Sequence, residues 1–209
     1  SYTMTIQLPH DLQLDNAFWQ FSLSLWQDKK AQVALLRLQD TQHLRVNLLL
    51  FSMWLGIEKK AITNYLLVTL EATECWHQQV VEPLRQVRKV LPLQSPTTIL
   101  KPQVQNSELL AEQIEQSLLF NCARKIPATT FITNSTQSVG NTLSILIKNL
   151  LACTAHAQSI KQLSTIDNSQ QKKHSTLSPS DLLLLVQACL PAHPASHISA
   201  CIDSLATSQ

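Results

Sequence analysis

Only two glycines, Gly56 and Gly140, occur among the 209 residues of this chain. Glycine supplies the positive φ angles of tight β-hairpin turns and lets a backbone approach phosphate groups closely. With so few glycines, neither the G-x-G-x-x-G fingerprint of dinucleotide-binding folds nor the P-loop motif can be written. The sequence therefore excludes these nucleotide-binding classes, argues against kinases with glycine-rich loops, and disfavours sheets built from tight hairpins.

Apolar side chains recur at intervals of three and four residues along most of the chain, which is typical of amphipathic helices. Pro83 should kink or restart the helix that contains it, because proline lacks the backbone donor and clashes with the preceding turn. Ser178 and Pro179 have the residue types of an N-cap and a first helical position. The expected helices span about 16–27, 31–39, 46–55, 58–81, 106–126, 137–163, 179–190 and 195–206. We therefore predict an all-α fold, a compact multi-helix bundle with an additional C-terminal helical hairpin.

Single residues set the expected ends of several helices. Asp15 is the expected N-cap of the first helix, and Asp40 or Thr41 that of the helix over 46–55. Gly56 is expected just past the end of that helix, where glycine commonly adopts a left-handed conformation. The basic residues near the end of the helix that follows Pro83 complement its dipole; they are Arg85, Arg88 and Lys89.

Composition shifts along the chain predict its organisation. Prolines concentrate between Pro92 and Pro102, and polar residues between Ser164 and Ser175, so we expect a linker at each place. The expected parts are an N-terminal extension (1–14), an aromatic-rich helical domain (15–91), a Pro-rich linker (92–105), helices that pack on the first domain (106–163), a flexible polar linker (164–177) and the C-terminal hairpin (178–209).

The charges are few and evenly spread, with a net charge of +2. Lys and Arg outnumber Asp and Glu by nine to eight up to Leu91 and by seven to six after it, so neither part has a basic excess for nucleic acid. No run of about 18 apolar residues occurs, and the start lacks a signal-peptide pattern. The five widely spaced cysteines are typical of reduced thiols. We expect a cytoplasmic protein that binds neither nucleic acid nor membrane.

A polar residue in an apolar segment gives the main candidate site. Asn47 lies within Val46–Leu50, and its amide needs a partner if it is buried: a neighbouring helix, or a ligand. Asp40 is expected to cap the next helix; alternatively, Gln39 and Asp40 line a polar pocket with Asn47. The tryptophans nearby, Trp19 and Trp54 among them, are expected in the core, although an open pocket or a groove for a partner helix would also use them. The candidate binding residues are therefore Trp19, Gln39, Asp40, Asn47 and Trp54.

No pattern indicates a catalytic or metal site. Cys189, His193, His197 and Cys201 are spaced four apart, but the ends of such a helix would lie about 18 Å apart, and two prolines interrupt it. Cys75 and His77, two positions apart, point to different faces of a helix. We expect no metal, no cofactor and no catalytic residues, and we lean toward a protein that is not an enzyme.

Several segments together resemble a known family. They are Phe18-Trp19-Gln20-Phe21-Ser22-Leu23, Leu38-Gln39-Asp40, Val46-Asn47-Leu48-Leu49-Leu50-Phe51 with Trp54-Leu55, Pro83-Leu84-Arg85-Gln86-Val87-Arg88 and Glu108-Leu109-Leu110-Ala111-Glu112-Gln113-Ile114-Glu115. Over about 15–121 the chain is similar to the bacterial DUF2390 family. The resemblance implies a cytoplasmic, all-helical domain and no particular activity. The chain departs from the family pattern at His43, where the family is expected to have glycine, and its end beyond about Gln137 has no counterpart there.

Two functional hypotheses follow from these observations. The first is a helical module that binds a protein partner or regulates one, because no catalytic constellation is present. The alternative is a binding protein or enzyme for a small apolar molecule held between aromatic-rich helices near Asn47. An open cavity beside Asn47, Gln39 and the tryptophans would favour the alternative, and a packed core with an exposed apolar patch would favour the first.

Overall fold

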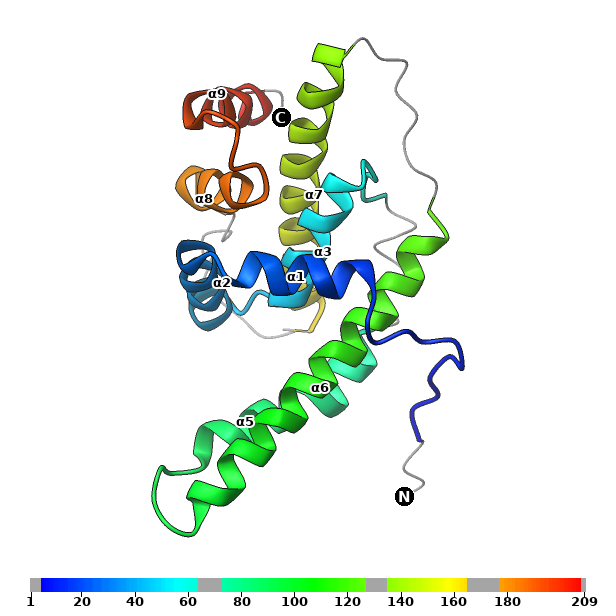
Figure 1. Ribbon diagram of the computed structural model, residues 1–209, viewed down its shortest axis with the longest axis vertical. Coiled ribbons are helices and arrows are strands. Elements are labelled where there is room, and N and C mark those ends of the chain that lie inside the picture. The colour runs from blue at the N-terminus through cyan, green and yellow to red at the C-terminus, as the bar shows by residue number, and fades with distance from the viewer. Residues whose placement is uncertain (1–4, 64–72, 127–134, 165–176, 208–209) are drawn as a thin grey trace. The chain divides into compact units, whose positions relative to one another are not determined.

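The computed structural model describes residues 5–63, 73–126, 135–164 and 177–207, and within these the regular structure is helical with no strand (Figure 1). The helices are α1 (Ala17–Trp26), α2 (Lys29–Gln42), α3 (Val46–Ile57), the π-helix η1 (His77–Val81), α5 (Glu82–Val90), α6 (Thr97–Arg124), α7 (Ser135–Ser164), α8 (Pro179–Cys189) and α9 (Ala195–Ala206). The predicted all-α class is confirmed. Among the described helices, none has the length and apolarity needed to cross a membrane.

The chain forms two compact units, and each draws on separate parts of the sequence. Unit 1 contains residues 1–20 and 68–125, and unit 2 contains residues 21–67 and 126–209. The division differs from the linear order of predicted domains, because the predicted domain over 15–91 contributes to both units. Most of the predicted polar linker over 164–177 lies outside the described residues.

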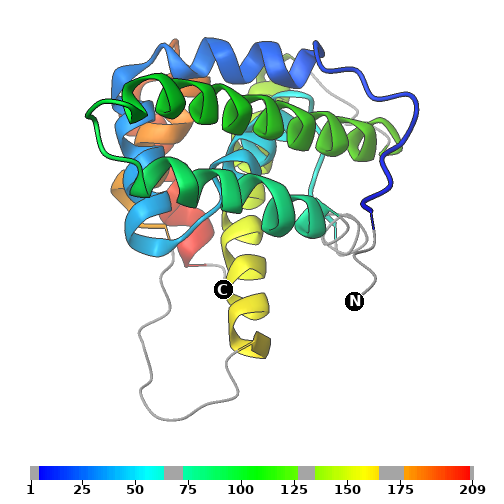
Figure 2. The same ribbon diagram turned by 90° about the horizontal axis from the view of Figure 1, so that it is seen from below.

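Unit 1 is built on the antiparallel pair α5 and α6, which run side by side in both views (Figures 1 and 2). Residues 73–76 are helical and lead directly into η1 and then α5. Pro83 lies in the first turn of α5, as its effect on a helix predicts. Its ring would clash with the carbonyl of Gln79 in a regular helix, and the π-helical turn, in which the Glu82 N–H reaches the His77 carbonyl, accommodates it.

α6 begins at Thr97, nine residues before the predicted start at about 106, so most of the predicted Pro-rich linker over 92–105 is helical. Pro102 lies inside this helix, in its second turn. A proline there removes one backbone hydrogen bond close to the end of the helix, where the loss is smaller than at the middle. The predicted start of this helix was too late, because the prolines between Pro92 and Pro102 were interpreted as a linker.

Unit 2 has its core between α3 and α7, with α2, α8 and α9 packed around them. The side chains that are fully buried in this unit include Leu35, Leu38, Phe51, Met53, Leu55, Leu146, Ile147 and Leu150. Asn149 of α7 is a buried polar residue of this core: its Nδ2 donates to the carbonyls of Ser52 (3.3 Å) and Lys60 (2.9 Å). Its Oδ1 accepts from the Ile62 N–H at 2.9 Å, so one side chain ties the end of α3 to α7.

Gly56 lies inside α3 and not beyond its end, which corrects the predicted C-terminal position. A Cβ atom on Gly56 would lie 2.7 Å from Leu146 Cα, so glycine is required by the close approach of α7. The left-handed residue that ends α3 is Lys59, at φ 57°. The Lys60 N–H bonds the Leu55 carbonyl and the Lys59 N–H bonds that of Gly56, which is the Schellman pattern. The predicted helix over 58–81 therefore does not start at Glu58.

Two other predicted caps are also corrected. The N-cap of α1 is Asn16, whose Oδ1 accepts from the Trp19 N–H at 2.9 Å, whereas Asp15 accepts from the side chain of Gln20. Asp40 lies in the last turn of α2, so it does not cap α3, and Arg45 occupies the N-cap position there without a side-chain cap bond. The first turn of α3 is thus left without the polar cap that its sequence suggested.

The C-terminal hairpin is confirmed. The Ser178 hydroxyl accepts from the Asp181 N–H at 3.1 Å and caps α8, with Pro179 in the first turn. Gln187 Nε2 donates to the His193 carbonyl at 2.7 Å, across the turn between α8 and α9. Arg37 of α2 bonds Asp181, so a side chain from the first helical turn of α8 joins the hairpin to α2.

Candidate functional site

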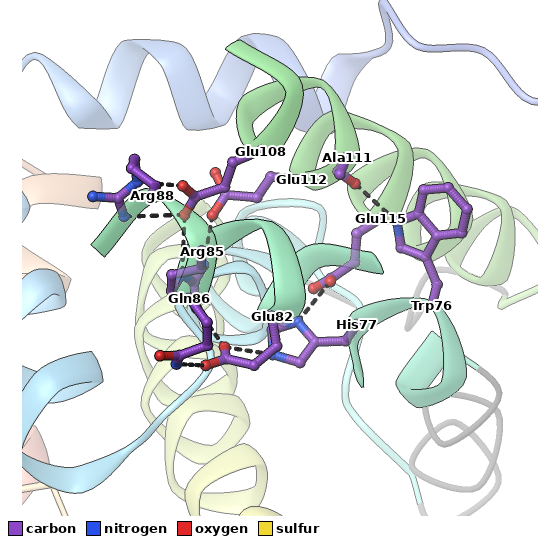
Figure 3. Close-up of polar contacts among 10 residues, drawn as sticks. All are labelled: Trp76, His77, Glu82, Arg85, Gln86, Arg88, Glu108, Ala111, Glu112 and Glu115. Atoms are coloured by element: carbon purple, nitrogen blue, oxygen red, sulfur yellow. Dashed lines mark hydrogen bonds and ion pairs between the residues drawn. The ribbon is translucent and has the colours of Figure 1, made fainter. Parts of the chain in front are cut away.

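A buried ion-pair network joins α5 to α6 in unit 1 (Figure 3). Arg85 of α5 is its centre and is buried, with only 6% of its surface exposed. Its guanidinium bonds Glu112 (Nη2, 2.6 Å) and Glu108 (Nε, 3.1 Å) of α6 and Glu82 of its own helix (Nη1, 3.3 Å). Charge-assisted bonds of this kind are the strong ones, and a buried charge is tolerated only with such partners.

Arg88, one turn further along α5, shares Glu108 with Arg85. Its Nε bonds Glu108 Oε2, and its Nη2 bonds Oε1 at 3.2 Å, so the carboxylate is held in a bidentate pair. Burial would raise the pKa of Glu108, but hydrogen bonds from Arg88 and Arg85 outweigh it and lower that pKa. For Glu112, burial prevails over the attraction of Arg85, and its pKa is raised. The pKa values of Glu108 and Glu112 are therefore shifted in opposite directions.

The network continues through the π-helical segment. His77 Nδ1 lies 2.8 Å from Glu115 Oε2, and Glu115 is completely buried. The other ring nitrogen of His77 lies 4.0 Å from Glu82, so the imidazole stands between two carboxylates (Figure 3). Trp76 Nε1 donates to the Ala111 carbonyl at 2.9 Å. These contacts fix η1 and α5 along two turns of α6.

This network was not predicted from the sequence, where Arg85, Arg88 and Lys89 were interpreted as cations that complement a helix dipole. Arg88 and Lys89 do lie in the last turn of α5, but Arg85 is buried and both arginines bond carboxylates on another helix, so the interpretation was incomplete. A usable signal was present. Arg85 and Arg88 are three apart, and Glu108, Glu112 and Glu115 follow spacings of four and three, so each set lies on one face of its helix. Both sets also lie in segments that carry the family resemblance.

The candidate residues predicted from the sequence lie on three helices. Gln39 and Asp40 lie in the last turn of α2, Asn47 in the first turn of α3, and Trp54 two turns further along α3. Asn47 is half-buried and does not lie in the core. Both Asn47 and Asp40 have interaction partners. Trp54 is 6% exposed and its ring lies 6.2 Å from that of Phe51.

Trp19 lies in α1, in a part of the chain assigned to unit 1, and is half-buried. Phe18 beside it is completely buried. The structure thus places Trp19 in a different unit from Gln39, Asp40, Asn47 and Trp54.

The residues of the Cys-His pattern are divided between two helices. Cys189 ends α8, His193 lies in the turn, and His197 and Cys201 are in α9. Burial raises the pKa of the Cys189 thiol to about 12, so this thiol stays protonated at neutral pH. In the described part of the chain, no group of three His, Cys, Asp or Glu residues is placed to hold a metal ion.

Exposed apolar side chains gather at the end of the α5–α6 hairpin. We call them the apolar tip; they are Val87 and Val90 of α5, Leu93 of the connection, and Ile99 and Leu100 of α6. Val90, Leu93 and Ile99 have 76%, 81% and 71% of their surface exposed. The connection itself is held by Lys101 Nζ, which donates to the Leu91 carbonyl at 2.8 Å, and by Thr97 Oγ1, which donates to that of Pro92 at 2.5 Å.

The fold and the network define an all-helical protein in which buried ion pairs hold a helical hairpin with an apolar tip. Residues 17–119 match the model of the family described as Protein of unknown function (DUF2390), and the chain belongs to this family through that region. The match confirms the resemblance over about 15–121, and it contains both arginines and all the carboxylates of the network. No curated protein and no solved structure was found to match the chain.

Proposed function

We propose that this protein is a protein-interaction module that docks a partner on the apolar tip. The observation that carries the proposal is the cluster of exposed valine, leucine and isoleucine side chains where α5 and α6 meet. Contiguous exposed apolar surface is rare on soluble proteins unless a partner covers it.

The ion-pair network supports this function through rigidity. Arg85 and Arg88 hold α5 against α6 within two turns of the tip, and Thr97 and Lys101 hold the connection. A surface that is ordered before it binds loses less conformational entropy on binding. The tip can therefore present its side chains to a partner in one arrangement.

The alternative, a site for a small apolar molecule near Asn47, has less support. Trp54 and Phe51 of α3 are buried, as side chains of a packed core are, and Asn47 is half-buried at the start of the helix. The groove that unit 2 presents on α2 and α8 is lined by other residues. Buried aromatic side chains together with an exposed apolar patch were the combination expected for protein binding, and an open cavity the one expected for a small ligand. The observations therefore favour protein binding.

Variants of the tip test the proposal. The tagged protein and its Val90→Glu/Ile99→Glu variant are compared in affinity capture from the native cell, with quantitative mass spectrometry of the captured proteins. Both positions are exposed, so the variant should fold, and circular dichroism checks this. Leu23→Glu, which also introduces a negative charge at an exposed apolar position, here on α1, is the matched control.

We expect at least one partner to be captured by the unchanged protein and by Leu23→Glu, and lost from the tip variant. The same set of proteins captured by all three forms would contradict the proposal.

A further inference from the structure

Unit 2 carries a shallow groove that the proposed function does not use. It lies between α2 and α8, has a volume of about 430 Å³, and is lined by Lys29, Lys30, Val33, Ala34, Arg37 and Leu184. Five of these residues come from α2, at positions that share one face of the helix. The lining is cationic at both ends and apolar at its centre.

The lysines occupy positions that do not favour helix stability. Lys29 and Lys30 form the first turn of α2, which contains no acidic residue, and the N-terminus of a helix carries partial positive charge. The N-cap Asp28 accepts from the Lys30 and Ala31 N–H groups and offsets part of this charge. Two cations at the positive end of a helix dipole oppose folding, and residues that break a local rule in this way are candidates for function.

Arg37 supplies the cation at the other end of the groove, eight residues or about 12 Å along α2. Asp181, buried in the first turn of α8, bonds its Nη2. The Arg37 side chain is still 47% exposed. Of its own guanidinium nitrogens, Nη2 is the one that bonds a side chain among the described residues. A guanidinium has five N–H donors, so Arg37 is both held in place and able to bind a second carboxylate.

The centre of the groove is apolar. Val33 is 65% exposed between the two cationic ends, and Ala34 and Leu184 lie beside it. An exposed valine in the groove can contact the apolar side of an amphipathic helix from a partner, and the lysines and arginine around it can contact the polar side of that helix.

We propose that this groove binds an amphipathic helical segment of a partner protein, with acidic side chains at both ends and an apolar side chain between them. The charge of the groove selects acidic residues, and its apolar centre selects a leucine-like side chain. The distance from Lys29 to Arg37 requires carboxylates seven or eight residues apart on the bound helix, because that spacing covers about 10–12 Å. The surface is separate from the apolar tip, so this inference does not rest on the proposed function.

The experiment measures binding of a synthetic helical peptide by fluorescence anisotropy. The probe carries two glutamates seven residues apart with leucines between them, and a second peptide has glutamine in place of both glutamates. The full chain is compared with Lys29→Glu/Lys30→Glu and with Lys148→Glu, which reverses an exposed charge on α7 outside the groove. Vesicles of phosphatidylglycerol are tested as competitors.

The glutamate peptide should bind the unchanged chain and Lys148→Glu with affinities within about twofold, and binding to the double variant should fall about tenfold or more. The glutamine peptide should bind weakly to all forms. The double variant should melt at the same or a higher temperature, because it removes cations from a helix N-terminus. Equal binding to the double variant, equal binding of the glutamine peptide, no binding of either peptide, or displacement of the peptide by the vesicles would each overturn the proposal.

Discussion

At the scale of residues, the decisive side chains are the charges buried between α5 and α6. Arg85 has three carboxylates within hydrogen-bonding distance, and it shares buried Glu108 with Arg88. A buried ion pair contributes little compared with apolar packing, yet removal of one partner is costly because the other charge stays buried and unpaired. The network therefore specifies how the two helices pair.

Replacement of Arg85 by methionine tests this role. Arg85→Met keeps much of the side-chain volume but leaves Glu108 and Glu112 without a central cation, so the free energy of unfolding should fall by about 3–5 kcal/mol. Arg124→Met removes an exposed cation from the last turn of α6 and should cost less than about 1 kcal/mol. Urea unfolding followed by circular dichroism measures both. Equal losses would mean that the network does not stabilise the hairpin.

The opposite pKa shifts of Glu108 and Glu112 predict opposite pH dependences. The pKa of Glu108 is lowered from its ordinary value of 4.5, so its stabilising contribution is full above that pH and is lost as pH falls through the folded pKa. The pKa of Glu112 is raised, so its contribution is full below pH 4.5 and is lost as pH rises through the folded pKa.

Relative to the unchanged protein, Glu108→Gln should therefore become less stable as pH rises toward 4.5 from below, and Glu112→Gln more stable as pH rises above 4.5. Urea unfolding at a series of pH values checks both signs. Parallel curves for the two variants would show that the assigned directions are wrong.

At the scale of elements, the apolar periodicity predicted which segments are helical, and tertiary contacts decided where they end. α8 and α9 were predicted closely: Ser178 and Pro179 mark the start of α8 locally, and the prolines between the two helices separate them. α3 ended differently because Gly56 is needed for contact with Leu146, ninety residues away. α6 started earlier than predicted because a proline near a helix end is tolerated.

His43 shows how an unfavourable residue can end a helix. It follows α2 at φ 56°, a left-handed conformation that suits glycine, and its N–H bonds the Leu38 carbonyl. This is the position where the family resemblance led us to expect glycine.

His43→Gly should raise the free energy of unfolding by about 0.5–1 kcal/mol. Thr41→Gly, two residues earlier and inside α2, should lower it by a similar amount, because glycine weakens a helix interior. Thermal unfolding of the two variants separates the effects, and destabilisation by both would contradict the assigned left-handed conformation.

Gly56→Ala tests the close contact of α3 with α7. The added Cβ would lie 2.7 Å from the Leu146 Cα, and a backbone atom can move only if α7 moves, so we expect a loss of about 1–3 kcal/mol. Ser52→Ala, one turn earlier on the same buried helix, removes a hydroxyl that bonds the Leu48 carbonyl and should cost less than about 1 kcal/mol. Chemical unfolding gives both values. If the free energy of unfolding of Gly56→Ala equals that of the unchanged protein, α3 and α7 do not approach each other as closely as the structure shows.

At the scale of the whole molecule, the sequence was sufficient for the all-α class, the family and the C-terminal hairpin. It did not predict which distant segments form each unit, because helical periodicity shows that a face is buried but not which helix covers it. The burial of single polar residues was equally hard to predict. Asn47, a polar residue in an apolar segment, was the expected candidate for a buried amide but is half-buried, whereas the side-chain amide of Asn149 in α7 is buried and bonds backbone groups at the end of α3. The ion pairs of Arg85 also depend on a pairing between helices about twenty residues apart in sequence.

The claim that the apolar tip docks a protein partner is tested most directly by photo-crosslinking in the native cell. A photoreactive amino acid is placed at Leu93, the most exposed large apolar side chain of the tip, and separately at Leu23 of α1. We predict a discrete protein crosslink from position 93 that Val90→Glu/Ile99→Glu abolishes, and no such product from position 23. A crosslink at position 23 alone, the same products from both positions, or a product at position 93 that persists in the tip variant would contradict the account.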